Sequence, residues 1–88
     1  LKDSRQKEHS YMLICKYSGN LEDEIFNAIS ELSKRYVTKS KTIKDNEIEL
    51  IIEVLTSEKN SQIPNKLLEL NGVVDASMIS YSNNLLDK

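Results

Sequence analysis

Three features of this sequence carry side chains that could do chemistry: a cysteine, a histidine and a run of acids. Cys15 is the only cysteine and His9 the only histidine. A soft-metal site needs a close pair of cysteines and a nucleophile needs a base beside it, so neither site can be assembled. Glu22, Asp23 and Glu24 suit a hard cation, but acids at this position also stabilise a helix start through its dipole. We therefore predict no catalytic residue, no metal site and no cofactor.

The segment "KYSGNLEDEI", from Lys16 to Ile25, is the place where a ligand is expected to reach the backbone. A strand-like run ends here, a glycine follows, and an amphipathic helix begins. Gly19 has no Cβ, so it can adopt a positive φ and leave room beside the main chain. Ser18, Gly19 and Asn20 are therefore the candidate ligand-binding residues. A plain strand-to-helix turn uses a glycine equally well, and we favour that alternative.

Length and composition limit the possible classes of protein. The 88 residues allow one domain, and 39% hydrophobic with 30% charged residues is typical of a folded soluble chain. A net charge of −2 offers no basic excess to neutralise phosphates, so nucleic acid is not an expected partner. No apolar run reaches the roughly 18–20 residues that a membrane span requires. One cysteine cannot form a disulfide framework.

The first strand and the first helix must position the segment around Gly19. Alternating apolar residues predict a strand over 10–18, and His9 is expected in the lead-in before it. Apolar residues spaced three and four apart predict a helix whose stripe runs from Leu21 to Tyr36. Asn20 is the expected N-cap, and Lys34 and Arg35 are expected in the last turn.

Residues 37–43 and 47–55 predict a hairpin. A two-residue turn at Asp45 and Asn46 would point Lys39 and Lys41 into the core, which costs more than a longer loop. We therefore predict a three-residue loop or a bulge, with Asn46 left-handed. The inward residues of the first strand would then be Thr38 and Ser40.

The remaining residues predict a short helix and a last strand. The helix lies in "NSQIPNKLLELNG", with Pro64 in its first turn and Gly72 just past its end. Its inner stripe is Ile63, Leu67 and Leu70. In the last strand, "VVDASMISYS", the expected inward residues are Val74, Ala76 and Met78.

The order β-α-β-β-α-β predicts an α+β, ferredoxin-like sandwich. We expect a four-stranded antiparallel sheet in the order 4-1-3-2, with both helices on one face. The domain is expected over residues 10–82, with residues 1–9 as a lead-in from a preceding region and 83–88 as a tail. The chain starts at Leu1 rather than methionine, which favours a piece of a longer protein.

The face of this sheet that the helices leave open is the expected interaction surface. Its aliphatic and aromatic residues are expected to be Met12, Ile14, Ile51, Ile79 and Tyr81. A contiguous apolar patch of this kind indicates docking or self-association. In the alternatives the strand register slips, or Leu85 and Leu86 fold back over the patch. The two central strands present acids and no aromatic residue on this face, which argues against RNA binding.

The order of elements and the segment "SGNLEDEI" resemble those of ACT domains, which are small ferredoxin-like modules. Gly19, Leu21 and Ile25 carry the match, whereas Tyr17 and Ser18 stand where that family has an acid and a proline. Many ACT domains bind amino acids or other small effectors, and they pair with one another. The resemblance therefore implies an effector site near Gly19 or a contact between two copies.

A longer resemblance covers residues 11 to 82. The "ELIIEV" strand, the "LNGV" helix end and the "SY" strand end are similar to the soluble C-terminal domain of a family of uncharacterised bacterial membrane proteins. In that family several membrane spans precede an ACT-like module. The resemblance implies a non-catalytic regulatory or oligomerisation domain at the cell membrane, on its cytoplasmic side. Its implied partner is a second copy or the rest of its own membrane protein, and a small-molecule sensor is the alternative function.

Overall fold

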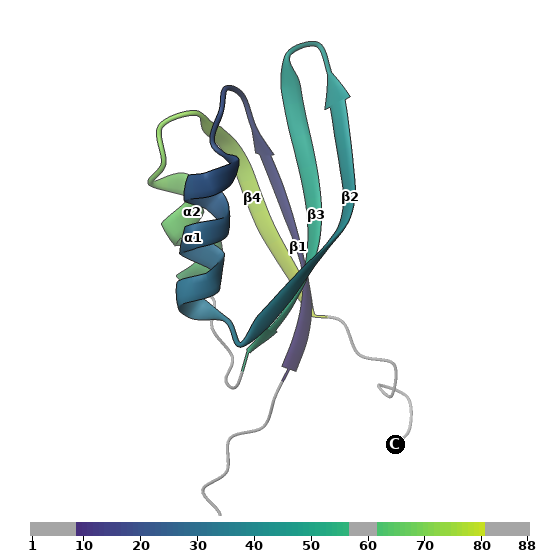
Figure 1. The fold of residues 1–88 in the computed structure, drawn as a ribbon, viewed down its shortest axis with the longest axis vertical. Coiled ribbons are helices and arrows are strands. Elements are labelled where there is room, and N and C mark those ends of the chain that lie inside the picture. The colour runs from purple at the N-terminus through teal and green to yellow at the C-terminus, as the bar shows by residue number, and fades with distance from the viewer. Residues whose placement is uncertain (1–8, 57–61, 81–88) are drawn as a thin grey trace, which may run out of the picture.

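The computed structural model describes residues 9–56 and 62–80. The chain forms an α+β fold with four antiparallel strands in the order β2-β3-β1-β4 (Figure 1). This order is 4-1-3-2 read from the other edge, as predicted, and it is broadly consistent with a ferredoxin-like fold. The elements along the chain are β1 (His9–Tyr17), α1 (Glu22–Leu32), β2 (Arg35–Lys44), β3 (Glu47–Thr56), α2 (Gln62–Leu68) and β4 (Val73–Ser80).

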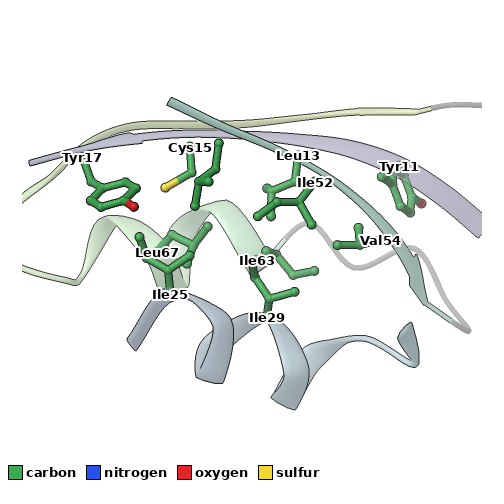
Figure 2. Close-up of a cluster of buried hydrophobic side chains, with 11 residues drawn as sticks. Tyr11, Leu13, Cys15, Tyr17, Ile25, Ile29, Ile52, Val54, Ile63 and Leu67 are labelled. Carbon is green, nitrogen blue, oxygen red and sulfur yellow. The ribbon is translucent and has the colours of Figure 1, made fainter. Parts of the chain in front are cut away.

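Both helices pack on one face of the sheet, which we call the helix face; the opposite face is the open face (Figure 2). From Tyr11 on β1 and from Leu50 on β3, every second residue points toward the helices and is buried, as alternation predicts. Burial of each such aliphatic side chain contributes about 1.5–3 kcal/mol to the free energy of unfolding. The buried hydrophobic core is Tyr11, Leu13, Cys15, Tyr17, Ile25, Ile29, Leu50, Ile52, Val54, Ile63 and Leu67.

The first helix begins later and ends earlier than its apolar stripe predicts. Leu21, not Asn20, occupies the N-cap position, and its side chain makes no capping hydrogen bond. The helix ends at Leu32, where extended backbone at Ser33 breaks the ladder and its Oγ donates to the carbonyl of Ile29 at 2.8 Å. The N-cap prediction for Asn20 was therefore wrong.

The two residues expected in the last turn of this helix lie beyond its end. Lys34 donates its backbone N–H to the carbonyl of Leu55 at 2.7 Å, and Arg35 is the first residue of β2. Tyr36 also lies in β2, where its ring stacks on Phe26 with centroids 5.6 Å apart. Tyr36 continues the apolar spacing of the helix because it packs against the helix from the neighbouring strand.

The hairpin between β2 and β3 closes with a two-residue turn. Asp45 and Asn46 have φ of 53° and 67°, the paired left-handed geometry of a tight hairpin. The prediction of a left-handed Asn46 is confirmed. Of the predicted three-residue loop or bulge, the loop is absent and the bulge is present, between Thr38 and Ser40. In this register Lys41 lies opposite the buried Leu50.

A bulge in the middle of β2 corrects the register further down the hairpin. Thr38 pairs with Ile52 and Ser40 pairs with Ile51, which leaves Lys39 as the extra residue. Thr38 therefore lies on the helix face, as predicted. Ser40 lies on the open face, contrary to the prediction, because the bulge falls between these two residues.

The second helix and the last strand show a similar shift. Ile63 and Leu67 are buried as predicted, whereas Leu70 is only partly buried and Gly72 lies four residues beyond the helix end. In β4 the register shifts so that Tyr17 pairs with Val73 and Lys16 with Asp75. The list of inward residues therefore begins with Val73, since Val74 is the bulged residue and is 56% exposed.

Candidate functional site

The open face brings together four of the five residues expected on it. Met12 lies opposite Ile79, and Ile14 lies opposite Ile51, so these pairs are neighbours along and across the strands. We call Met12, Ile14, Ile51 and Ile79 the aliphatic patch. Ile79 is 54% exposed and the other three are half-buried. Tyr81 lies outside the described residues.

The patch contributes nothing to the core of the fold. The buried residues of both helices contact the other side of the sheet, so no helix among the described residues covers the patch (Figure 2). Antiparallel sheets usually place polar residues on a face that meets water. The aliphatic side chains at the centre of this face depart from that usual pattern.

Charges of both signs border the patch. Toward the hairpin turn, Lys16 lies between Glu49 on β3 and Asp75 on β4. Beside Met12, Glu53 forms an ion pair with Lys39 at 3.7 Å. A border of mixed sign does not fit a polyanion, and it is compatible with a protein surface of equally mixed charge.

The loop around Gly19 is closed by a second loop of the same chain. Ser18 donates its backbone N–H to the carbonyl of Gly72 at 3.0 Å. Gly72 has a φ of +114°, and a Cβ there would lie 2.8 Å from Cδ1 of Leu21, so only glycine fits this approach. Gly19 has a φ of +92°, with nothing within 4 Å of the Cβ position. Ser18, Gly19 and Asn20 are all exposed.

The hollows on the described surface include three shallow ones of about 430, 110 and 500 Å³. The first lies at the hairpin end and is lined by Lys16, Thr42, Lys44, Asp45, Glu47, Ile48 and Glu49. None of the three is lined by Ser18, Gly19 or Asn20. The hollows therefore add no support for a ligand at these three residues.

A polar cluster joins β1, α1 and β2 near the end of the sheet that carries the turn between β2 and β3. The hydroxyl of the buried Tyr17 donates to Oε2 of Glu22 at 2.8 Å, and Nζ of Lys41 contacts the same oxygen. The hydrogen bond from Lys41, followed by that from Tyr17, lowers the pKa of the Glu22 carboxyl group. Burial, with the adjacent Glu22, raises the pKa of Tyr17. Lys41 thus points toward the helix face without being left unpaired.

The sequence did not reveal this cluster, although it contained a signal for it. Residue pattern alone disfavours a two-residue turn, because such a turn would point Lys39 and Lys41 into the core without partners. The acids at the start of α1 suit the helix dipole, and one of them, Glu22, is also the partner of Lys41. Five residues separate Tyr17 from Glu22, and only the fold brings Lys41 to them.

Replacing Glu22 by glutamine should make the free energy of unfolding less dependent on pH in the acidic range. The folded-state pKa of Glu22 is depressed, so its stabilising contribution is present above the unfolded pKa and is lost as pH falls through the folded pKa. Glu22→Gln should therefore be less stable than wild type at pH 7, by at most about 1 kcal/mol because the pair is partly exposed. Urea denaturation between pH 7 and pH 2 measures this difference, which should close on acidification.

Glu24→Gln is the matched control, because Glu24 is an exposed acid in the same first turn and outside the cluster. It should change stability less than Glu22→Gln at pH 7. Equal losses in the two variants would assign the effect to the helix dipole and contradict a role for the cluster.

The remaining candidates for chemistry have structural roles. Cys15 is fully buried, and burial, followed by the charge of Asp75, raises its pKa to about 11, so it remains a protonated core thiol. His9 is not in a lead-in: it is the first residue of β1, opposite Thr56. Among residues 9–56 and 62–80, no three His, Cys, Asp or Glu side chains are grouped so that they could hold a metal ion.

Comparisons with protein-family models, with curated proteins and with solved structures give no match for this chain. The described part of the chain contains no helix that is both long and apolar enough to cross a membrane.

Proposed function

We propose that this chain is a non-catalytic regulatory or oligomerisation domain that acts through its open sheet face. The observation that carries the proposal is the aliphatic patch, which is contiguous across β1, β3 and β4 and lies outside the core. Burying apolar surface yields about 25 cal/mol per Å². A patch that the fold does not need can therefore supply the free energy for a contact with another molecule.

The proposed occupant of the open face is a second copy of the chain. If a two-fold axis runs parallel to the strands, β1 of one copy lies over β3 of the other. Ile14 then faces Ile51 of the second copy, and Lys16 faces Glu49 of the second copy. The mixed charges next to the patch thus complement each other, and each contact is made twice, as a two-fold interface requires.

The wider setting of the domain is part of the same proposal. The resemblance of residues 11 to 82 supports an ACT-like, ferredoxin-like module of a bacterial multi-pass membrane protein, on the cytoplasmic side of the cell membrane. In that setting, pairing through the open face would bring two membrane-anchored chains together. Contact of the same face with the rest of its own protein is the competing outcome.

A sensor for a small amino-acid-like effector is the second candidate function. The open space beside the left-handed Gly19 favours it, whereas the use of the Ser18 amide by Gly72 removes one donor from a ligand. A thermal-shift screen with free amino acids checks this alternative. A ligand at 100 times its Kd adds about 2.7 kcal/mol of stability, and no shift with any amino acid would remove the candidate.

Methyl resonances recorded over a dilution series test the role of the open face. The methyl shifts of Ile14 and Ile51 should depend on concentration, because association buries them. The shifts of Ile43, which is 66% exposed on the hairpin, should stay constant. Open-face methyl shifts that are independent of concentration, or larger changes at Ile43, would contradict self-association through this face.

A further inference from the structure

One exposed turn combines the features that allow an asparagine to deamidate without an enzyme. Asn71 and Gly72 form the single Asn-Gly pair of the sequence, and both residues are exposed. They lie between the end of α2 at Leu68 and the start of β4 at Val73, so they belong to neither element. Because glycine has no side chain, nothing on Gly72 blocks the approach of its backbone nitrogen to the asparagine carboxamide.

The backbone N–H of Gly72 is not used by the fold. Val73 donates its N–H to the carbonyl of Leu70 at 3.2 Å, which closes a β-turn with Asn71 and Gly72 at its two central positions. Gly72 has a φ of +114°, and a positive φ is what a type II turn requires at its third residue. Within residues 9–56 and 62–80, no backbone carbonyl accepts the N–H of Gly72. Loss of this proton therefore breaks no backbone hydrogen bond in the described part of the chain.

The reaction at this turn needs only water as a co-reactant. The backbone nitrogen of Gly72 loses its proton and attacks Cγ of Asn71, so that a C–N bond forms between them. The carboxamide C–N bond of Asn71 breaks, ammonia leaves with that proton, and a cyclic succinimide remains. Water then opens the ring at either of its two carbonyl carbons. One opening gives aspartate, and the other gives isoaspartate, in which the main chain runs through Cβ and Cγ.

The isoaspartate product does not fit the contacts that hold this turn. Its main chain has one more carbon between Leu70 and Gly72, whereas both residues are fixed by hydrogen bonds, from Val73 to Leu70 and from Ser18 to Gly72 at 3.0 Å. Gly72 also packs closely against the neighbouring loop. A Cβ on it would lie 2.8 Å from Cδ1 of Leu21 and 3.0 Å from the carbonyl oxygen of Ser18. The longer main chain therefore displaces Gly72 away from Ser18.

We propose that Asn71 is a modification site, at which deamidation to isoaspartate separates the turn after α2 from the loop around Gly19. In the unmodified chain the Ser18 amide donates to Gly72. In the modified chain this amide becomes a free donor next to the open space beside Gly19. A chemical change in one loop thus alters the hydrogen-bonding capacity of a second loop that is distant in the sequence.

Peptide mass spectrometry of the whole chain, after incubation in mildly alkaline buffer, tests the reaction. Asn46 is the internal control, because it is exposed in a turn but is followed by Glu47 rather than glycine. Asn71 should deamidate at least about tenfold faster than Asn46. An isoaspartate-specific methyltransferase should label position 71. A chain that keeps its asparagine at position 71, or that loses both asparagines at similar rates, would overturn the proposal.

Amide hydrogen exchange tests the structural consequence. In the isoaspartate form, isolated by chromatography, the Ser18 amide should exchange at least about tenfold faster than in fresh wild type. Freshly purified Asn71→Asp is the matched variant, because it carries the same added charge on an ordinary main chain. Its Ser18 amide should exchange as in wild type. Unchanged exchange at Ser18 in the isoaspartate form would overturn the proposal. Equal acceleration in Asn71→Asp would also overturn it, since the charge alone would then explain the change.

Asn71→Gln separates the reaction from other effects of incubation. Glutamine keeps the carboxamide, but its extra carbon requires a larger ring, which forms far more slowly. Incubated Asn71→Gln should therefore contain no isoaspartate at position 71, and its Ser18 amide should remain protected. If the Ser18 amide of this variant loses protection on incubation as in wild type, the change does not come from Asn71 and the proposal is wrong.

Discussion

An Ile52→Ala chain is expected to lose about 2–5 kcal/mol of its free energy of unfolding. Ile52 is fully buried on the helix face of β3, in the core cluster that also contains Leu13 (Figure 2). Removing its outer carbons leaves a cavity that a sheet cannot collapse to fill. Folded domains are stable by about 5–15 kcal/mol, so this loss is a large share of the total. Urea denaturation measures this loss of free energy. The comparison is valid if the m-value, the slope of the unfolding free energy against urea concentration, is the same in both chains.

The adjacent residue provides the control. Ile51 lies next to Ile52 on the same strand, but it is half-buried on the open face. Ile51→Ala should cost less stability than Ile52→Ala and should weaken self-association instead. If the core variant does not fold, Ile52→Val, with an expected loss of about 0.5–1.5 kcal/mol, replaces it. Equal stability losses at the two positions would contradict the division into a core face and an interaction face.

The sequence predicted the central part of the fold because alternation and helical spacing report burial directly. The buried positions of β1 and β3 follow from the period-two alternation of apolar and polar residues. A shift of the strand by one residue would turn the apolar side chains to the other face of the sheet. Ile25 and Ile29 follow from helical spacing in the same way. The placement of Met12, Ile14 and Ile51 on one face depends on these same patterns.

The errors arose where distant residues decide a local structure. A lysine at position 41 is acceptable on the helix face only because Glu22, from α1, reaches its ammonium group. A bulge in the β2–β3 hairpin was one of the two predicted structures, but its position was not predicted, and the bulge in β4 was not predicted at all, since each bulge reconciles the register of two neighbouring strands. The helix end at Leu32 was missed because Tyr36, in β2, continues the same apolar spacing by packing on Phe26.

The elements around Gly19 show a related limit. The sequence indicated that a glycine was needed there, and Gly19 is left-handed. It did not indicate that Gly72 would lie against Leu21 and accept a hydrogen bond from Ser18. Two loops separated by more than half of the chain meet here, and only the tertiary structure shows that the Ser18 amide is already used.

Ile14→Glu is expected to weaken self-association at least tenfold, which corresponds to about 1.4 kcal/mol. Ile14 lies at the centre of the aliphatic patch, opposite Ile51 on β3. A carboxylate there would be buried without a partner in the proposed dimer, whereas in the monomer it can remain in water. Ile43→Glu makes the same substitution at an isoleucine that is 66% exposed and points away from the open face. It should associate like wild type.

Folding of both variants is checked by thermal denaturation, since Ile14 belongs to a central strand. If Ile14→Glu does not fold, Ile79→Glu replaces it, because Ile79 is 54% exposed on an edge strand. The replacement should weaken association in the same direction. A folded Ile79→Glu chain with unchanged association would place the contact elsewhere.

Sedimentation equilibrium over a concentration series most directly tests whether the chain associates through its open face. Wild type, Ile14→Glu and Ile43→Glu are measured side by side in the same buffer. We predict that wild type and Ile43→Glu form the same associated species, and that Ile14→Glu shifts to smaller ones. A wild-type chain that stays monomeric at the highest concentration, or three chains that sediment alike, would contradict the proposed function.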